Sequence, residues 1–137
     1  MELSAKTIQK YKGRGISFLL REAETVFNRY IRQRDSQDGY FKCISCQEYK
    51  PVSKMHAGHF MSAGHHTAVR FNEDNVHGQC EKCNTFLHGN LISYQENLIK
   101  KIGQDSVDII KSTCRNTAKW HRIDLISIIE TYKGKLK

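Results

Sequence analysis

The sequence predicts an α+β fold in which short strands and loops form a metal-organised centre and amphipathic helices flank it. Apolar residues recur at helical spacing towards both ends of the 137-residue chain, whereas residues 40–90 break into short pieces rich in Gly, His and Asn. Those pieces contain two Cys-x-x-Cys pairs, so metal can replace the large apolar core that they lack. We expect a single domain, with a basic helical segment at 1–39, this centre at 40–90 and further helices at 91–137.

The first expected helix begins after Ser17 and runs to about Arg34. Its apolar residues are spaced three and four positions apart and share one face: Leu19, Leu20, Ala23, Val26, Phe27, Tyr30 and Ile31. Two interpretations of the opposite, polar face remain open, since it is either simply solvated or in contact with phosphates. Residues 35–39 are expected to form a turn.

Three further helices are expected after residue 90. Their apolar positions are Leu91, Tyr94, Leu98 and Ile102 in the first, Val107, Ile110 and Cys114 in the second, and Leu125, Ile128, Ile129 and Tyr132 in the third. Gly103 and Gly134 mark the expected ends of the first and the third. Because Cys114 has no partner in the sequence, we expect it to be a core residue.

The net charge of +8 is spread unevenly along the chain. Residues 1–34 carry eight basic and three acidic side chains, residues 35–90 carry five and six, and residues 91–137 carry nine and five. Six of the seven His and four of the five Cys lie in the near-neutral middle. This pattern favours a basic frame that binds nucleic acid around a centre that does chemistry. No secretion signal or membrane partner is expected, and we expect an intracellular protein.

The cysteine pairs Cys43/Cys46 and Cys80/Cys83 are separated by 33 residues. Zn²⁺ prefers thiolate ligands in tetrahedral structural sites, and each pair can supply two sulfurs from one tight turn or one helix start. Redox-active or incidental cysteines are the alternative, although a thioredoxin-like motif would occur only once. We therefore predict a structural Zn²⁺ held by all four cysteines, with no open position for chemistry.

The segment between the two pairs contains several His and Asn residues. His59 lies 13 residues after Cys46, Asn75 lies five residues before Cys80, and Asn84 directly follows Cys83. A single His is more often structural than functional. The spacing of these residues relative to the cysteine pairs therefore supports a functional site better than the number of His and Asn residues does.

Cys-x-x-Cys, His, Asn and Cys-x-x-Cys-Asn, in this order, resemble the HNH or His-Me finger nuclease pattern. A more specific resemblance is to the phage NinG (Rap) family of recombination endonucleases. It rests on the segments AETVFNRYIRQRD, CISC, AGHF, RFNEDN, QCEKCN and GNLISYQENLIKKIG. The resemblance implies a zinc-stabilised ββα-metal core. It also implies a Mg²⁺- or Mn²⁺-dependent endonuclease that acts on branched DNA, such as Holliday junctions and D-loops, in the cytoplasm of a bacterial host.

The resemblance implies roles for three residues. His59 is expected to be the general base, since imidazole titrates near neutrality and can accept a proton from water. Asn75 is expected either to hold that imidazole by a hydrogen bond or to fix the loop that carries it. Asn84 offers a carbonyl oxygen, a hard ligand suited to Mg²⁺ or Mn²⁺.

One position departs from the nuclease pattern. Such nucleases often place Asp or His directly before the base, whereas this chain has Gly58. His56, which stands where relatives carry Asp, is a candidate second ligand of the catalytic cation, and the alternatives are that it orients a water or is structural. His88, four residues after Asn84, is a candidate third ligand, with a structural role as the alternative.

The basic flanks are expected to contact phosphates with little sequence preference, although for each residue singly an ordinary solvated charge is the alternative. The candidates are Arg21, Arg29, Arg32, Arg34, Lys100, Lys101, Lys111, Arg115, Lys119 and Arg122. Expected partners are branched or duplex DNA, a second copy of the chain in a homodimer, and host or phage recombination proteins. Two other functions remain open: an HNH nuclease that cuts plain duplex DNA, and a non-catalytic zinc module that binds nucleic acid.

Overall fold

The computed structural model describes residues 2–137, which divide into two compact units. A helical unit consists of residues 2–30 and 119–137, and a central unit consists of residues 31–118. The boundary falls within helix α2 (Ile16–Arg34), and each unit has buried side chains of its own. The prediction of a single domain stays a prediction.

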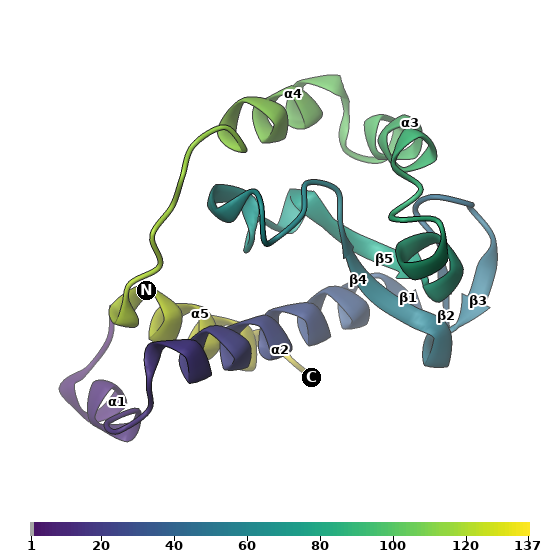
Figure 1. Cartoon of the computed structure of the whole chain (residues 1–137). Helices are drawn as coiled ribbons and strands as arrows, with labels where there is room; N and C mark the ends of the chain where they lie inside the picture. The colour runs from purple at the N-terminus through teal and green to yellow at the C-terminus, as the bar shows by residue number, and fades with distance from the viewer. Residues whose placement is uncertain (1) are drawn as a thin grey trace. The chain divides into compact units, whose positions relative to one another are not determined.

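The helical unit consists of α1 (Ala5–Lys10), most of α2 and α5 (Arg122–Lys135). The apolar face predicted for α2 is confirmed, because its residues Leu19, Ala23 and Phe27 are completely buried. The Phe27 ring meets the Tyr132 ring of α5 edge to face, with centroids 4.9 Å apart, and α5 runs beside α2 in Figure 1. None of the described helices is both long and apolar enough to cross a membrane.

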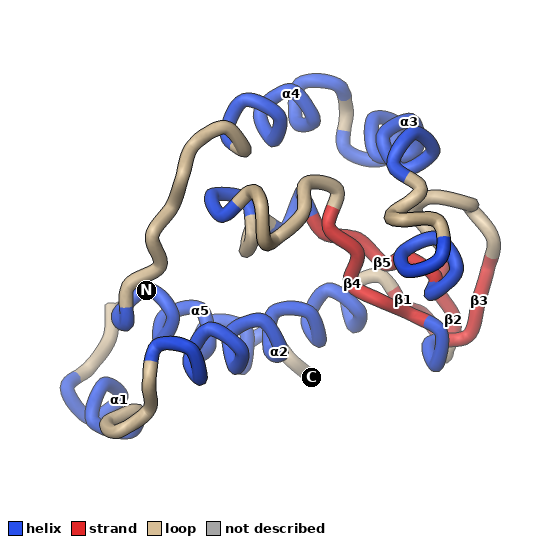
Figure 2. The backbone as a smooth tube through the Cα atoms, viewed as in Figure 1, coloured by secondary structure: helices blue, strands red, loops and turns tan. Residues whose placement is uncertain are grey.

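Five short strands form two antiparallel sheets in the central unit (Figures 1 and 2). The first sheet has the order β1 (Ser36–Gln37), β2 (Tyr40–Lys42) and β3 (Tyr49–Pro51). The second pairs β4 (Met55–His59) with β5 (Val76–Cys80), so that His59 lies opposite Val76. The connections contain 3₁₀ turns at Val52–Lys54, Thr67–Val69 and Glu73–Asn75, and a π-helix, Lys82–Phe86, follows β5. The predicted mixed α+β class is thus confirmed.

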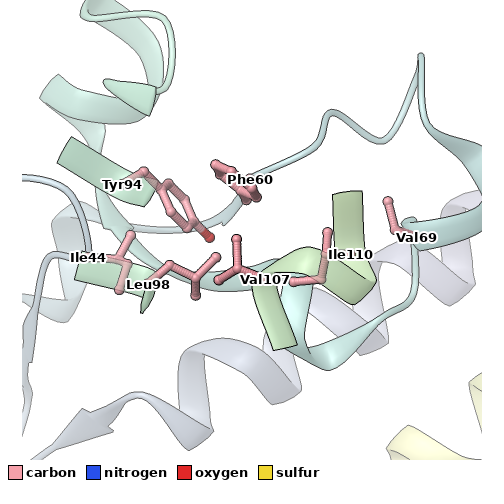
Figure 3. Close-up of a cluster of buried hydrophobic side chains, with 7 residues drawn as sticks. All are labelled: Ile44, Phe60, Val69, Tyr94, Leu98, Val107 and Ile110. Atoms are coloured by element: carbon pink, nitrogen blue, oxygen red, sulfur yellow. The ribbon is translucent and has the colours of Figure 1, made fainter. Parts of the chain in front are cut away.

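The apolar core of the central unit lies between its loops and the helices α3 (Leu91–Ile102) and α4 (Gln104–Thr113). It contains seven buried side chains, drawn in Figure 3: Ile44, Phe60, Val69, Tyr94, Leu98, Val107 and Ile110. Cys114 packs against this cluster, as predicted. The Tyr94 hydroxyl donates to the Gly58 carbonyl at 2.7 Å. This bond ties strand β4 to α3 next to His59.

An ion pair at the C-terminal end of α2 fixes strand β5. The Arg34 guanidinium pairs with Asp35 at 2.8 Å and donates to the carbonyls of Glu73 and Val76 at 3.0 and 2.7 Å. The Asp35 carboxylate accepts the Gly78 N–H at 2.8 Å. Burial raises the pKa of Asp35, but Arg34, Lys101 and this N–H outweigh it and hold the pKa below its usual value. The carboxylate therefore stays ionised and keeps β5 in register.

Candidate zinc centre and active site

The four cysteines predicted to bind zinc meet at one point. Cys43 and Cys46 lie in the turn after β2, Cys80 ends β5, and Cys83 lies in the π-helix. All four Sγ atoms lie within 4.8 Å of one another, and those of Cys46 and Cys80 are 3.9 Å apart. With Zn–S bonds of about 2.3 Å, the edge of a ZnS₄ tetrahedron is about 3.8 Å. The spacing of the sulfurs is therefore close to that of a zinc site, and the cluster could hold a zinc ion.

Hydrogen-bond donors surround these sulfurs. The N–H of Cys80 points to Cys43 Sγ at 3.3 Å, the N–H of Cys83 points to Cys80 Sγ at 3.5 Å, and the Asn90 amide lies 3.5 Å from Cys83 Sγ. Such donors stabilise the thiolate form that a metal needs. Among residues 2–137, no other group of three or more His, Cys, Asp or Glu side chains lies close enough together to hold a metal ion.

His59 is the last residue of β4, at the end of the strand where the sequence places the base. Its Nε2 lies 3.0 Å from the Arg70 carbonyl oxygen. In the tautomer whose proton lies on Nε2, the neutral imidazole donates to this carbonyl and has its lone pair on Nδ1. Burial lowers the pKa of His59 below its ordinary value of 6.5, against opposing hydrogen bonds to the backbone of Arg70 and Ala57. The ring is therefore neutral at neutral pH, the state that a general base requires.

Asn75 is completely buried and bonds to the loop between β4 and β5. Its Nδ2 donates to the carbonyls of Met61 and Val69 at 2.9 and 3.1 Å, and its Oδ1 accepts the Met61 N–H at 2.8 Å. This loop carries the Arg70 carbonyl that His59 contacts. The geometry matches the second of the two expected roles for Asn75, in which it fixes the loop.

His59, Asn84 and His88 line one cavity of about 380 Å³. Asn84 lies in the π-helix, and its Nδ2 is 2.8 Å from Nδ1 of His56. A donated bond from Nδ2 leaves the Asn84 Oδ1 able to accept a cation. The structure therefore brings three of the predicted residues to the cavity and places His56 against Asn84, although His56 does not line the cavity.

The structure explains why a glycine, Gly58, precedes His59. A Cβ atom at this position would lie 2.0 Å from Gln79 Oε1 and 2.9 Å from Gln79 Cβ. Gln79 is completely buried, and its Nε2 donates to the Gly89 carbonyl at 2.6 Å and to Ser45 Oγ at 2.8 Å. No Asp or His can occupy position 58 while Gln79 is held there. Sequence reasoning missed Gln79, and the only signal for it was the unexpected glycine.

The predicted DNA-binding residues have different surroundings. Arg21, Arg29, Lys100, Arg115 and Lys119 are exposed, whereas Arg32 and Lys111 are half-buried.

The other three candidates make contacts within the protein. Arg34 binds the carbonyls described above, and Arg122 donates to the carbonyls of Tyr11 and Arg14. Lys101 donates to His77 Nδ1 at 2.9 Å. The hydrogen bonds that these three side chains make within the protein could not be predicted from the sequence, because the acceptors lie far away along the chain.

Comparison with known proteins identifies the family. The family model described as "Bacteriophage Lambda NinG protein" matches residues 2–137. The chain belongs to the NinG family. The resemblance to NinG found in the sequence is thereby confirmed, and the buried positions around the cysteine cluster and His59 are features of a NinG chain.

Several phage proteins named "Protein ninG" are similar to this NinG chain. Those of Escherichia phage lambda and Escherichia phage 933W are each 36% identical to it, and the match covers 88% of the chain and 57% and 58% of the two relatives. That of Salmonella phage P22 is 34% identical, with 88% of the chain and 57% of the relative covered. The chain thus spans little more than half the length of these relatives. No solved structure matches it.

Proposed function

We propose that this NinG chain is an HNH-type, divalent-metal-dependent endonuclease of phage recombination that hydrolyses phosphodiester bonds in branched DNA, including Holliday junctions and D-loops. The observation that carries the proposal is the shared cavity of His59 and Asn84, in which His59 Nε2 lies 3.0 Å from the Arg70 carbonyl oxygen. The preference for branched DNA comes from the family resemblance and not from the geometry.

Each residue has a defined task in this reaction. His59 Nδ1 accepts a proton from water, and the resulting hydroxide attacks the phosphorus in line with the leaving oxygen. Asn84 Oδ1 is the first protein ligand for Mg²⁺ or Mn²⁺, and His56 and His88 are the further candidates. When bound, the cation neutralises charge on the phosphate and on the leaving oxygen. Asn75 keeps the loop and its Arg70 carbonyl in place.

The cysteine cluster has a structural role in the proposal. A bound Zn²⁺ would join strand β5, the turn after β2 and the π-helix through the ligands Cys43, Cys46, Cys80 and Cys83. Asn84 directly follows the last ligand, so zinc binding fixes the position of the catalytic-cation ligand as well. Four cysteine ligands leave no open position on the zinc for water or substrate.

In this proposal, exposed basic side chains hold the DNA by contacting its phosphates. Binding is then strongly salt-dependent and weakly sequence-specific. A host-cell cytoplasmic location, a homodimer on a symmetric junction and contacts with other recombination proteins belong to the same proposal.

The test is a comparison of a four-way junction, a D-loop, a flap and a plain duplex, each incubated with the zinc-loaded protein. We expect cleavage of the junction and the D-loop when Mg²⁺ or Mn²⁺ is added and none when both are omitted. Equal cutting of the plain duplex would favour a general HNH nuclease. Binding without cleavage of any substrate, in either metal, would contradict an enzymatic function and favour a non-catalytic zinc module.

A further inference from the structure

The outward face of the β1–β2–β3 sheet carries two exposed tyrosines beside a lysine. Lys42 lies opposite Tyr49 in the ladder, and Tyr40 lies opposite Pro51, so Tyr40, Lys42 and Tyr49 share one face. Phe41 points the other way and is buried against the cysteine cluster. Tyr40 and Tyr49 remain 57% and 73% exposed, although aromatic rings bury a large apolar area when they have a partner. We call Tyr40, Lys42 and Tyr49 the tyrosine face.

A basic cavity adjoins the tyrosine face. It has a volume of about 460 Å³, and its charged lining residues are Arg34, Asp35, Lys42, Lys100 and Lys101. The tyrosine face lines a second cavity, of about 470 Å³, which shares Asp35 and Lys42 with the first. The two cavities therefore adjoin at Asp35 and Lys42, between the aromatic rings and the lysines of α3.

Four cations and two carboxylates, Asp35 and Asp38, line the two cavities together, so their combined charge is positive, although the cavity at the tyrosines holds only Lys42 beside both carboxylates. Four cations line the basic cavity beside one carboxylate, and that carboxylate already pairs with Arg34 at 2.8 Å. Lys100 and Lys101 are both exposed, but Lys101 is directed to Asp35 and His77, at 3.6 and 2.9 Å. Lys42 and Lys100 are thus the cations best placed to receive an anionic ligand.

We propose that the tyrosine face and the basic cavity together bind a single strand of DNA. A base stacks on Tyr49, a second base reaches Tyr40, and the adjoining phosphates lie beside Lys42 and Lys100. The Lys42 Nζ is 6.0 Å from the centroid of the Tyr49 ring, so one nucleotide can contact both side chains. Exposed aromatic rings beside a cationic groove are the combination that binds unpaired nucleic acid.

This binding site rests on the proposed function, because the branched DNA of that proposal is what supplies an unpaired strand. Bases within a duplex stack on one another, whereas a displaced loop or an opened branch point offers unpaired bases. Binding at this site would give the chain a means of preferring such structures to plain duplex without reading the sequence.

The experiment measures binding in the absence of Mg²⁺ and Mn²⁺, so cleavage plays no part in it. The zinc-loaded protein is titrated by fluorescence anisotropy against a short oligothymidylate, an abasic strand of equal length and the corresponding duplex. We expect the oligothymidylate to bind more tightly than the abasic strand, because both have the same phosphates but only one has bases to stack.

Variants separate the two parts of the site. Tyr49→Ala is expected to weaken oligothymidylate binding by about 5- to 100-fold and to leave abasic binding unchanged, whereas Tyr49→Phe keeps the ring and the affinity. Lys100→Ala is expected to weaken the binding of both strands. It should also reduce the slope of the logarithm of the binding constant against the logarithm of the salt concentration by about 0.7. Ile109→Ala, at a position that is 61% exposed on α4, is the control for loss of an exposed apolar side chain.

Three results would overturn the inference: equal binding of the two strands by the unmodified protein, unchanged oligothymidylate binding by Tyr49→Ala, or equal losses in Tyr49→Ala and Tyr49→Phe. Zinc content and circular dichroism verify that each variant is folded. Tyr40→Ala tests the second proposed base contact in the same way. If Tyr49-dependent binding is found but no substrate is cleaved, the endonuclease proposal fails and the binding site stands.

Discussion

At the scale of single residues, the contact between His59 Nε2 and the Arg70 carbonyl orients the imidazole that we propose as the general base. A carbonyl partner orients the ring but carries no negative charge that would strongly stabilise an imidazolium ion. Burial also disfavours the charged ring, and the pKa of His59 falls below 6.5. The ring is a weaker base as a result, but a larger share of it is in the neutral form that can accept a proton at neutral pH.

The cleavage rate should therefore depend on pH in a defined direction. A base works when deprotonated, so the rate of single-turnover junction cleavage is expected to fall as the pH falls through the lowered pKa of His59. The midpoint of this acid limb should lie below 6.5, the ordinary value. Rates measured between about pH 5 and pH 8 at saturating Mg²⁺ provide the profile. A midpoint above 6.5 would show that the base is not the buried His59 described above.

Sequence reasoning located the cysteine cluster, whose ligand pattern is local, and missed side chains whose partners lie far along the chain. The cysteine pairs are recognisable because zinc sites use that spacing, whereas the roles of His59 and Asn84 come from the family resemblance and stay predictions. The buried amide of Gln79 and the role of Arg34 have no such signal. Arg34 donates to the Glu73 carbonyl, 39 residues away in the chain, and only the folded structure brings the two together.

At the scale of elements, the β4–β5 hairpin depends on close packing between its strands. Gly58 leaves the space that the Gln79 side chain fills, and Gln79 in turn holds the Gly89 carbonyl ahead of α3. The hairpin therefore supports both His59, at one end of β4, and the chain that leads into α3.

Gly58→Ala should destabilise the protein. The added methyl group would lie 2.0 Å from Gln79 Oε1, so the buried side chain or the strand must shift, at a cost of about 1–3 kcal/mol. Gly64→Ala is the matched control, because a Cβ there has no atom within 4 Å among the described residues. Urea unfolding monitored by circular dichroism measures both. Equal free energies of unfolding for the two variants would contradict the packing described for the hairpin.

Helices were predicted better than strands. The helix expected over 17–34 and the one expected from Leu91 to near Gly103 match Ile16–Arg34 and Leu91–Ile102, because their apolar spacing is long and regular. Strands β2 and β3 have three residues each and show too short a pattern to recognise. Helix α1 was not predicted, since none of its residues is buried and no apolar face marks it.

At the scale of the whole molecule, a cysteine cluster supplements the apolar core of the central unit. The apolar cluster around Tyr94 stabilises the α3 and α4 side, whereas the β2 turn, β5 and the π-helix converge on sulfur atoms. Metal ligation can provide folding free energy where few apolar side chains are available.

Loss of zinc should therefore unfold part of the molecule. Cys80→Ser is expected to abolish zinc binding, lower the melting temperature and eliminate junction cleavage, because it removes a ligand that is also the last residue of β5. Cys114→Ser, outside the cluster, is expected to retain one zinc per chain. Native mass spectrometry and thermal unfolding, with and without a chelator, measure these effects. A stable, active Cys80→Ser protein without zinc would refute a structural role for the metal.

The most direct test of the central claim is the rate at which His59→Ala cleaves a four-way junction under single-turnover conditions. His65→Ala is the matched control, because His65 is exposed and lies in the connection that follows β4. We expect the His59 variant to lose about 10²- to 10⁴-fold in rate while zinc content and junction affinity stay unchanged, and the His65 variant to cleave normally. Undiminished cleavage by His59→Ala would contradict the assignment of this residue as the base.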